Sequence, residues 1–462
     1  MSDVCLEKLD GPRKRYKQRV LLVFGIITYI ACFQWMYIHW LYPTFGYYGF
    51  DYNPPGTAYL ALAWVLGLLP SLWMPLVIVR PSQLAYWVLY SIVFIPCMFV
   101  PLYAGLSQPS QVARLMLTLF AGLGITGLSY FFPLRSFRPA QLRGSRFWFW
   151  FALLASTLTL WVVVAFRHQF QILSFSDVYD VRLAADDVMK GTLLNYPLMW
   201  LYGAINPFLM GWGLYHKKIG FFLAGSFGQL IVYGSMGTKA SILSIFFTAG
   251  FYFLLRGNRL PFAVKLTWSL AALVGGLCLF FVAADQDPGL LLWVVLSVVV
   301  MRLLSLNALA TAQYHGFLQN NPHTYFSHVK GISWLIHYPY GNMSVGGAVG
   351  NYYYNNYAMD QTTHFWATDG LSSFGLPGVL LISVFCAFVF WTLDSLAERH
   401  DPRLAALLIS YAAYNLANIG IFTTLLSGGL GLLILILYLM PRENAEVSVK
   451  AKVFNAALGR VT

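Results

Sequence analysis

The stretch GLPGVLLISVFCAFVFWTLDSL, residues 375–396, decides the fold. Asp394, close to its end, is its only charged residue. A helix of this length rises about 33 Å at ~1.5 Å per residue, enough to cross the ~30 Å hydrocarbon core of a bilayer. In lipid the segment must be helical, because a helix satisfies its backbone hydrogen bonds internally. We therefore predict a transmembrane helix here.

Comparable apolar runs recur along the chain. Hydrophobic residues make up 58% of the sequence and charged residues 10%, a balance that excludes a soluble fold. The sequence predicts an all-α polytopic membrane protein with about 12 transmembrane helices, in a single integral membrane domain over residues 1–462. The predicted spans are 20–42, 57–79, 84–104, 113–133, 147–166, 193–215, 219–235, 240–255, 261–284, 376–396, 403–422 and 425–440.

The net charge of +12 is not a sign of nucleic-acid binding, because the basic residues lie in short segments between the apolar runs and not on one basic face. Their distribution instead indicates which segments face the cytoplasm. Residues 290–312 start as an apolar run but carry Arg302. If this segment does not cross, 22 of the 29 Lys and Arg residues fall on the cytoplasmic side, as the positive-inside rule requires. We therefore place both termini in the cytoplasm. The seven basic residues left outside are Arg114, Arg167, Arg182, Lys190, Lys239, Arg302 and Lys330.

Two outer segments stand out in this topology, a first loop at 167–193 and a large second loop at 285–375. Long ordered insertions often carry function. The second loop holds five of the nine histidines, His315, His323, His328, His337 and His364.

The acidic residues of the outer face are all aspartates. Asp285 and Asp287 form a D-x-D pattern, by which some glycosyltransferases hold a divalent metal. The alternative is that the two aspartates form a polar cap where a helix leaves the membrane, and we favour this second interpretation. We expect no metal site and no cofactor.

Lys239 lies in a turn of small residues, GSMGTKAS at 234–241, between two short spans. Thr238 is a suitable N-cap for the following helix, and Lys239 adds a full charge to the positive end of its dipole. Such a turn can bind phosphate. The alternative is a lysine whose amine reaches the outer interface, with its stem in the apolar region.

Arg182 and Arg302 are the other outer cations that could bind a diphosphate, since guanidinium matches phosphate oxygens bidentately. Arg182 has Asp180, Asp186 and Asp187 as alternative partners in the sequence. Arg302 follows an apolar run without a local acid, so it needs a partner elsewhere.

His364 is followed at +11 and +14 by Gly375 and Gly378, which open the next span. This spacing resembles the signature of O-antigen ligases, in which that histidine is catalytic. The Lys239 turn resembles the Ser-Arg or Thr-Arg turn of the same superfamily, although lysine lacks the bidentate geometry of arginine. The His-Asn pair of the ligases is absent, because Phe365 follows His364.

With the YDVR sequence around Arg182 and the tyrosine-rich second loop, the pattern is similar to that of oligosaccharide repeat-unit polymerases of the O-antigen (Wzy) type. The resemblance implies a GT-C-like fold in the bacterial inner membrane and an active site facing the periplasm. It also implies an undecaprenyl-diphosphate-linked oligosaccharide as substrate, with membrane lipid around it and room for a chain-length regulator as partner. Arg182, Lys239 and Arg302 would stabilise the leaving diphosphate, and His364 would accept the proton of the attacking hydroxyl.

Sugar recognition is predicted for the aromatic residues of the second loop. We single out Tyr338, Tyr340, Tyr353 and Tyr354, together with Asp369. Tyrosine rings stack on sugars, but they also form the aromatic belts of membrane proteins, and the sequence does not separate the two roles.

Two alternatives to a polymerase remain open. A ligase that moves finished glycan to lipid A core would use the same cations and histidine with another acceptor. A transporter of lipid-linked oligosaccharide is expected to show internal repeats and ionisable residues near mid-membrane, whereas the spans here are almost free of charge.

Overall fold

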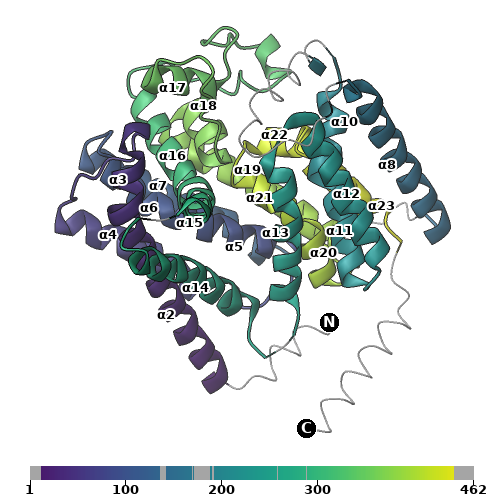
Figure 1. Cartoon of the computed structure of the whole chain (residues 1–462), viewed down its shortest axis with the longest axis horizontal. Helices are drawn as coiled ribbons and strands as arrows, with labels where there is room; N and C mark the ends of the chain where they lie inside the picture. The colour runs from purple at the N-terminus through teal and green to yellow at the C-terminus, as the bar shows by residue number, and fades with distance from the viewer. Residues whose placement is uncertain are drawn as a thin grey trace. The chain divides into compact units, whose positions relative to one another are not determined.

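The computed structural model describes residues 12–135, 142–168, 170, 188–189, 192–257, 259–287 and 289–441. Within these ranges every regular element is a helix, and no strand occurs (Figure 1). The predicted all-α fold of a polytopic membrane protein is confirmed.

In the described part of the chain, nine helices are long and apolar enough to cross a membrane. The chain is therefore a multi-pass membrane protein, but the predicted number of about 12 spans is not confirmed. The nine are Arg13–Tyr48, Ser82–Ala104, Pro109–Phe131, Gly144–Phe166, Ile219–Met236, Phe262–Ala283, Leu290–Phe317, Leu376–Ala397 and Ile421–Leu439, with the shorter apolar helices Thr57–Leu72 and Lys239–Leu255 beside them.

The differences from the predicted spans have local causes. The expected span at 403–422 is divided into the short helices α20 (Pro402–Leu408), α21 (Ser410–Leu416) and α22 (Ile421–Leu426). The nine also include Leu290–Phe317, a segment that we placed outside the membrane from its charge.

The chain divides into two compact units, each described here by itself. Unit 1 comprises Met1–Phe132, Phe253–Trp391 and Ala412–Thr424, and unit 2 comprises Pro133–Tyr252, Thr392–Tyr411 and Leu425–Thr462. The helices of unit 1 are α2 (Pro12–Met36), η1 (Tyr37–Leu41), α3 (Tyr42–Phe45), η2 (Gly46–Tyr48), α4 (Thr57–Leu68), η3 (Leu69–Leu72), α5 (Ser82–Leu89), η4 (Tyr90–Phe94), α6 (Ile95–Ala104), α7 (Pro109–Gly127), η5 (Leu128–Phe131), α14 (Phe262–Ala283), α15 (Leu290–Leu296), η7 (Ser297–Ser305), α16 (Leu306–Phe317), η8 (Ile332–Trp334), α17 (Val345–Tyr354), η9 (Trp366–Leu371) and α18 (Ser372–Phe374), with most of α19 (Leu376–Ala397).

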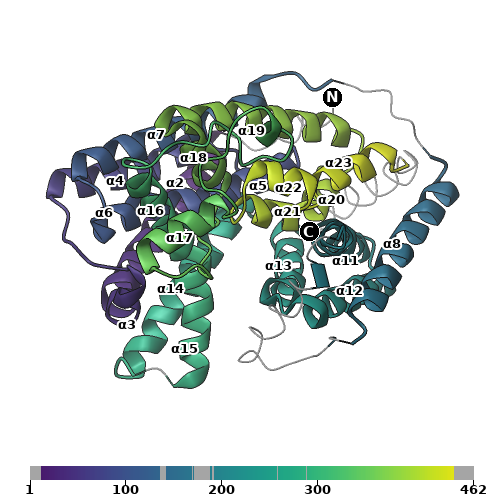
Figure 2. The same cartoon turned by 90° about the horizontal axis from the view of Figure 1, so that it is seen from above.

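The centre of unit 1 is the continuous helix α5–η4–α6. Every residue from Ser82 to Ala104 is buried, as expected for a helix that is apolar on all sides. At its flank, α2 and α14 run side by side (Figures 1 and 2). Their backbones approach closely at Gly25, where an added Cβ would lie 3.1 Å from the Thr267 hydroxyl oxygen. Small residues allow this close packing of helices in lipid.

The helix from Leu290 to Phe317 is continuous and 28 residues long. Near its start, Trp293 packs on Phe45 with ring centroids 6.0 Å apart, and near its end His315 Nδ1 lies 3.3 Å from the Ser107 hydroxyl. A helix of this length rises about 42 Å at ~1.5 Å per residue, which is enough to cross a membrane. Its predicted place outside the membrane stays a prediction.

Unit 2 holds α8 (Gly144–Phe166), α10 (Asn195–Trp200), η6 (Leu201–Ile205), α11 (Asn206–Tyr215), α12 (Ile219–Met236), most of α13 (Lys239–Leu255), α20 and α23 (Leu430–Leu439). Helices α11 and α12 lie side by side (Figure 2). A Cβ on Gly213 would approach the Phe222 nitrogen to 2.4 Å, and one on Gly225 would approach the Asn206 carbonyl oxygen to 2.6 Å. Glycine is therefore needed where these two helices meet.

Candidate functional site

The tyrosines predicted to bind sugar make hydrogen bonds and contacts that hold the segment after α16 in place within unit 1. The Tyr354 hydroxyl donates to the Tyr48 carbonyl over 2.9 Å and accepts from the Gln313 amide over 2.7 Å. Tyr338 donates to the Met343 carbonyl over 2.8 Å. The hydroxyls of Tyr340 and Tyr353 face the Pro322 carbonyl and Gly316. These contacts show a structural role, and sugar binding stays a prediction.

His364, the predicted proton acceptor, is fully buried. Its Nε2 atom lies 2.7 Å from the Thr311 hydroxyl and 3.8 Å from Cys97 Sγ, while Nδ1 is buried without a hydrogen-bond partner. Burial lowers the pKa of His364 to about 3, because an apolar site disfavours the charged imidazolium. Neither ring nitrogen of His364 is exposed in this structure, and its role as proton acceptor stays a prediction.

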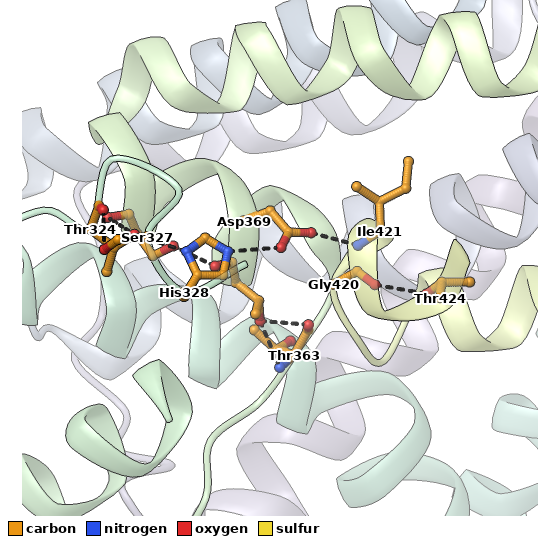
Figure 3. Close-up of polar contacts among 10 residues, drawn as sticks. Thr324, Ser327, His328, Thr363, Asp369, Gly420, Ile421 and Thr424 are labelled. Carbon is orange, nitrogen blue, oxygen red and sulfur yellow. Dashed lines mark hydrogen bonds and ion pairs between the residues drawn. The ribbon is translucent and has the colours of Figure 1, made fainter. Parts of the chain in front are cut away.

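Asp369 forms a carboxylate clamp with Thr324, His328 and Ile421 (Figure 3). His328 Nε2 donates to Asp369 Oδ1 over 3.1 Å, and the Ile421 N–H donates to Asp369 Oδ2. His328 Nδ1 lies 2.9 Å from the Thr324 hydroxyl, and the Thr324 N–H donates to the Ser372 carbonyl over 2.7 Å. Both oxygens of Asp369 are thus engaged by the protein, and its predicted contact with sugar has no support in this geometry.

The clamp joins three separate parts of the chain. A Cβ on Gly420 would lie 2.7 Å from both oxygens of Asp369, so the carboxylate rests directly against the backbone there. Beside it, Asn307 donates to Asn418 over 3.2 Å and accepts from the Thr363 hydroxyl over 2.9 Å. The clamp and these amides fix the corner before α22 against α16 and the start of η9.

Away from the clamp, polar side chains of unit 1 line a cavity of about 230 Å³ among α7, α16 and the start of α19. We call it the cationic pocket. No acidic residue is among its lining residues, which are Gln111, Arg114, His315, Leu318, Gln319, His323, Leu371, Gly375 and Leu376. Arginine, imidazole and amide groups make this pocket rich in hydrogen-bond donors, so it suits an anion or a sugar with an attached phosphate.

The two histidines of the cationic pocket differ in their hydrogen bonding. Gln319 donates its amide to Ser107 over 3.0 Å and lies 3.4 Å from His315 Nδ1, which the Ser107 hydroxyl also approaches to 3.3 Å. The Gln319 amide is a donor, so its approach favours Nδ1 as an acceptor and the neutral tautomer that carries its hydrogen on Nε2. His323 has a buried Nδ1 without a partner among the described residues, and its ring lies against Gly375. His323 is therefore the histidine whose nitrogens the protein leaves unoccupied.

The predicted diphosphate ligands are Arg182, Lys239 and Arg302, of which Lys239 and Arg302 belong to different units. Arg302 is exposed in η7. Lys239 begins α13 in unit 2, after a turn at Gly237 with φ of +62°, as expected for a small-residue turn. Arg182 lies outside the described residues. The roles predicted for these cations stay predictions.

Asp285 and Asp287 belong to the turn that ends α14. The Asp285 N–H donates to the Val282 carbonyl over 3.1 Å, and the Asp287 N–H donates to the Ala284 carbonyl over 2.9 Å. These backbone bonds close the carbonyl end of the helix. They do not involve the carboxylates, so the favoured role of a polar cap stays a prediction. No group of three potential metal ligands gathers among the residues that the structure describes.

The sequence analysis missed the cationic pocket. Arg114 was noted as an outer cation and His315 and His323 as loop histidines, but their proximity is not visible when some 200 residues separate them along the chain. One signal was available, because His315 and Gln319 are spaced i, i+4 and so share one helix face.

Comparisons with family models, with characterised proteins and with solved structures found no match to this chain. What the fold and the site define is the class of protein: a multi-pass helical membrane protein with an ordered segment between spans and a donor-rich pocket beside it.

Proposed function

We propose that this protein is a glycosyltransferase of the bacterial inner membrane. It joins undecaprenyl-diphosphate-linked oligosaccharide repeat units on the periplasmic face, by transfer of the growing glycan to the non-reducing end of a new unit. The observation that supports this function best is the cationic pocket, which is open, rich in donors and free of acids among its lining residues.

The reaction breaks the bond between the anomeric carbon of the donor and a diphosphate oxygen. A hydroxyl of the acceptor forms the new bond to that carbon and loses its proton. Arg114 and the Nε2–H of His315 stabilise the negative charge on the leaving diphosphate, since fixed donors aimed at developing charge lower the barrier. His323 accepts the proton, because its ring lines the cavity and has no hydrogen-bond partner among the described residues.

The sequence-based assignment uses other residues for both roles. It gives the contacts with the leaving diphosphate to Arg182, Lys239 and Arg302. It gives the proton transfer to His364, whose Nε2 lies 2.7 Å from the Thr311 hydroxyl inside a sealed core. Moving this step to His323 keeps the chemistry and uses a histidine that lines open space. Asp369 becomes a positioning residue that holds the segment carrying the pocket.

The test uses purified full-length protein and lipid-linked repeat unit, with products separated on a gel. A ladder of glycan lengths, formed with or without a chelator, is the expected result. Product only after addition of lipid A core would favour the ligase. Movement of the lipid-linked unit across vesicles without any new glycosidic bond would favour the transporter and refute the proposal.

A further inference from the structure

A second cluster of cations lies at the connection between α13 and α14, which we call the basic turn. It lines a cavity of about 380 Å³ whose lining residues are Arg256, Gly257, Arg259, Leu260 and Lys265, with no acid among them. The Ala263 N–H donates to the Leu76 carbonyl over 3.1 Å, so this turn packs beside the connection between η3 and α5.

Two other arginines at this end of unit 1 already have protein partners. Arg19 donates to the carbonyls of Ser71 and Met74 over 2.6 and 2.8 Å. Arg80 donates to the carbonyls of Ser129 and Phe132 over 3.2 Å each. These side chains satisfy the carbonyl ends of helices and so have a structural role.

Arg256 and Arg259 differ from them. Both side chains are exposed, and among the described residues neither makes a hydrogen bond or an ion pair with the protein. The turn itself is held in shape, because Lys265 Nζ donates to the Arg256 carbonyl over 2.8 Å and Gly257 takes a φ of +78°. Two guanidinium groups are therefore presented from a fixed backbone toward an open cavity.

The surroundings of the basic turn are apolar. Phe253 and Leu260 are 64% and 45% exposed, and α14, which begins directly after the turn, is long and apolar enough to cross a membrane. A soluble anion would meet only the cations, whereas a phospholipid would place its phosphate on them and its acyl chains along the neighbouring apolar surface. Basic pockets beside membrane helices suit anionic headgroups for this reason.

We propose that the basic turn binds the phosphate headgroup of an anionic phospholipid through Arg256 and Arg259. This site is separate from the cationic pocket, and the proposal does not rest on the glycosyl transfer proposed above.

The experiment titrates the full-length protein in detergent with phosphatidylglycerol, with phosphatidylcholine of the same chains, and with glycerol 3-phosphate. The midpoint of thermal unfolding reports binding, since a ligand of the folded state raises it. The test variant is Arg256→Gln with Arg259→Gln. Its matched control is Arg13→Gln with Arg15→Gln, two exposed arginines at the start of α2 that carry the same charge.

Phosphatidylglycerol is expected to raise the midpoint at lower concentration than phosphatidylcholine does. Each basic residue near an anionic lipid contributes about fivefold, so the test variant should need roughly 30-fold more phosphatidylglycerol. The control should respond like the unchanged protein, and Arg256→Lys with Arg259→Lys should keep most of the effect. Equal weakening in test and control variants, or an equal response to glycerol 3-phosphate, would overturn the proposal.

Discussion

The cationic pocket and the carboxylate clamp both contain residues of the segment after α16, yet their histidines differ in hydrogen bonding. In the clamp, His328 has a partner on each ring nitrogen, Asp369 on one side and Thr324 on the other. In the pocket, His323 has none among the described residues. A histidine with both nitrogens engaged holds structure together, whereas one facing open space can exchange a proton. Hydrogen-bond occupancy, and not residue type, separates the two regions.

The largest expected effect is on the clamp. Asp369→Ala should cost about 3–5 kcal/mol of stability, because it leaves His328 and the Ile421 N–H without their buried partner. Thermal unfolding in detergent measures this loss. Asp360→Ala is the control, since Asp360 is exposed and bonds only local groups, Ser344 and Thr362. An unchanged midpoint for Asp369→Ala would mean that the clamp does not hold the segment.

In the pocket, Arg114→Ala and His323→Ala should each slow glycan lengthening by ~100- to 1000-fold, the usual cost of losing one contact to the transition state. Both variants should reach the membrane in normal amounts, because neither side chain makes a hydrogen bond or an ion pair with the described residues. The ladder of glycan lengths, normalised to membrane protein, is the measurement.

The control for the pocket is His337→Ala, an exposed histidine of the same segment that does not line the cavity. It should leave the ladder unchanged. A normal ladder from His323→Ala beside a lost ladder from well-folded His364→Ala would return the proton transfer to the buried histidine.

A smaller effect is expected at Gly375, whose φ is +64°. Alanine there meets His323 Cε1 at 3.3 Å, in addition to a backbone strain of about 1–3 kcal/mol. Gly341 also has a positive φ, of +61°, but no neighbour within 4 Å of an added Cβ. Activity per folded molecule should therefore fall more in Gly375→Ala than in Gly341→Ala. Equal activity of the two variants would show that the ring position of His323 is unimportant.

The last prediction concerns pH. The pKa of His364 is about 3 in the folded protein, below its ordinary value of about 6.5. The unfolded chain binds the proton first as pH falls, so this residue's stabilising contribution is full above pH ~6.5 and is lost progressively toward pH ~3. Thermal midpoints of the His364→Gln variant should fall less steeply over this window than those of the unchanged protein. Parallel slopes would contradict the sealed environment of His364.

The sequence was sufficient to predict the fold class. A long apolar run such as 375–396 must satisfy its backbone hydrogen bonds internally in lipid, and a helix does so. It was not sufficient for the number of spans. The expected span at 403–422 breaks after Leu408 and again before Ile421. At the second break, the Ile421 N–H donates a hydrogen bond to the Asp369 carboxylate. That interaction joins residues 52 positions apart, which periodicity along one segment cannot reveal.

The candidate site was predictable as a region but not in its residues. The second outer loop was singled out by its histidines, and the cationic pocket does lie against it. Which histidine is accessible depends on packing: Phe365 and Trp366 are fully buried beside His364 and carry it into the core, while His323 stays at the edge. A motif spacing such as that from His364 to Gly375 records distance along the chain and contains no information on burial.

Gly420 has a consequence for how this protein can change over generations. Any side chain at position 420 would collide with the carboxylate of Asp369, and removal of that carboxylate leaves His328 Nε2 and the Ile421 N–H without their partner. Neither position can be altered alone at low cost. In descendants of this gene, positions 369 and 420 should therefore vary together, and a larger residue at 420 should be found only where 369 has become a shorter or neutral one.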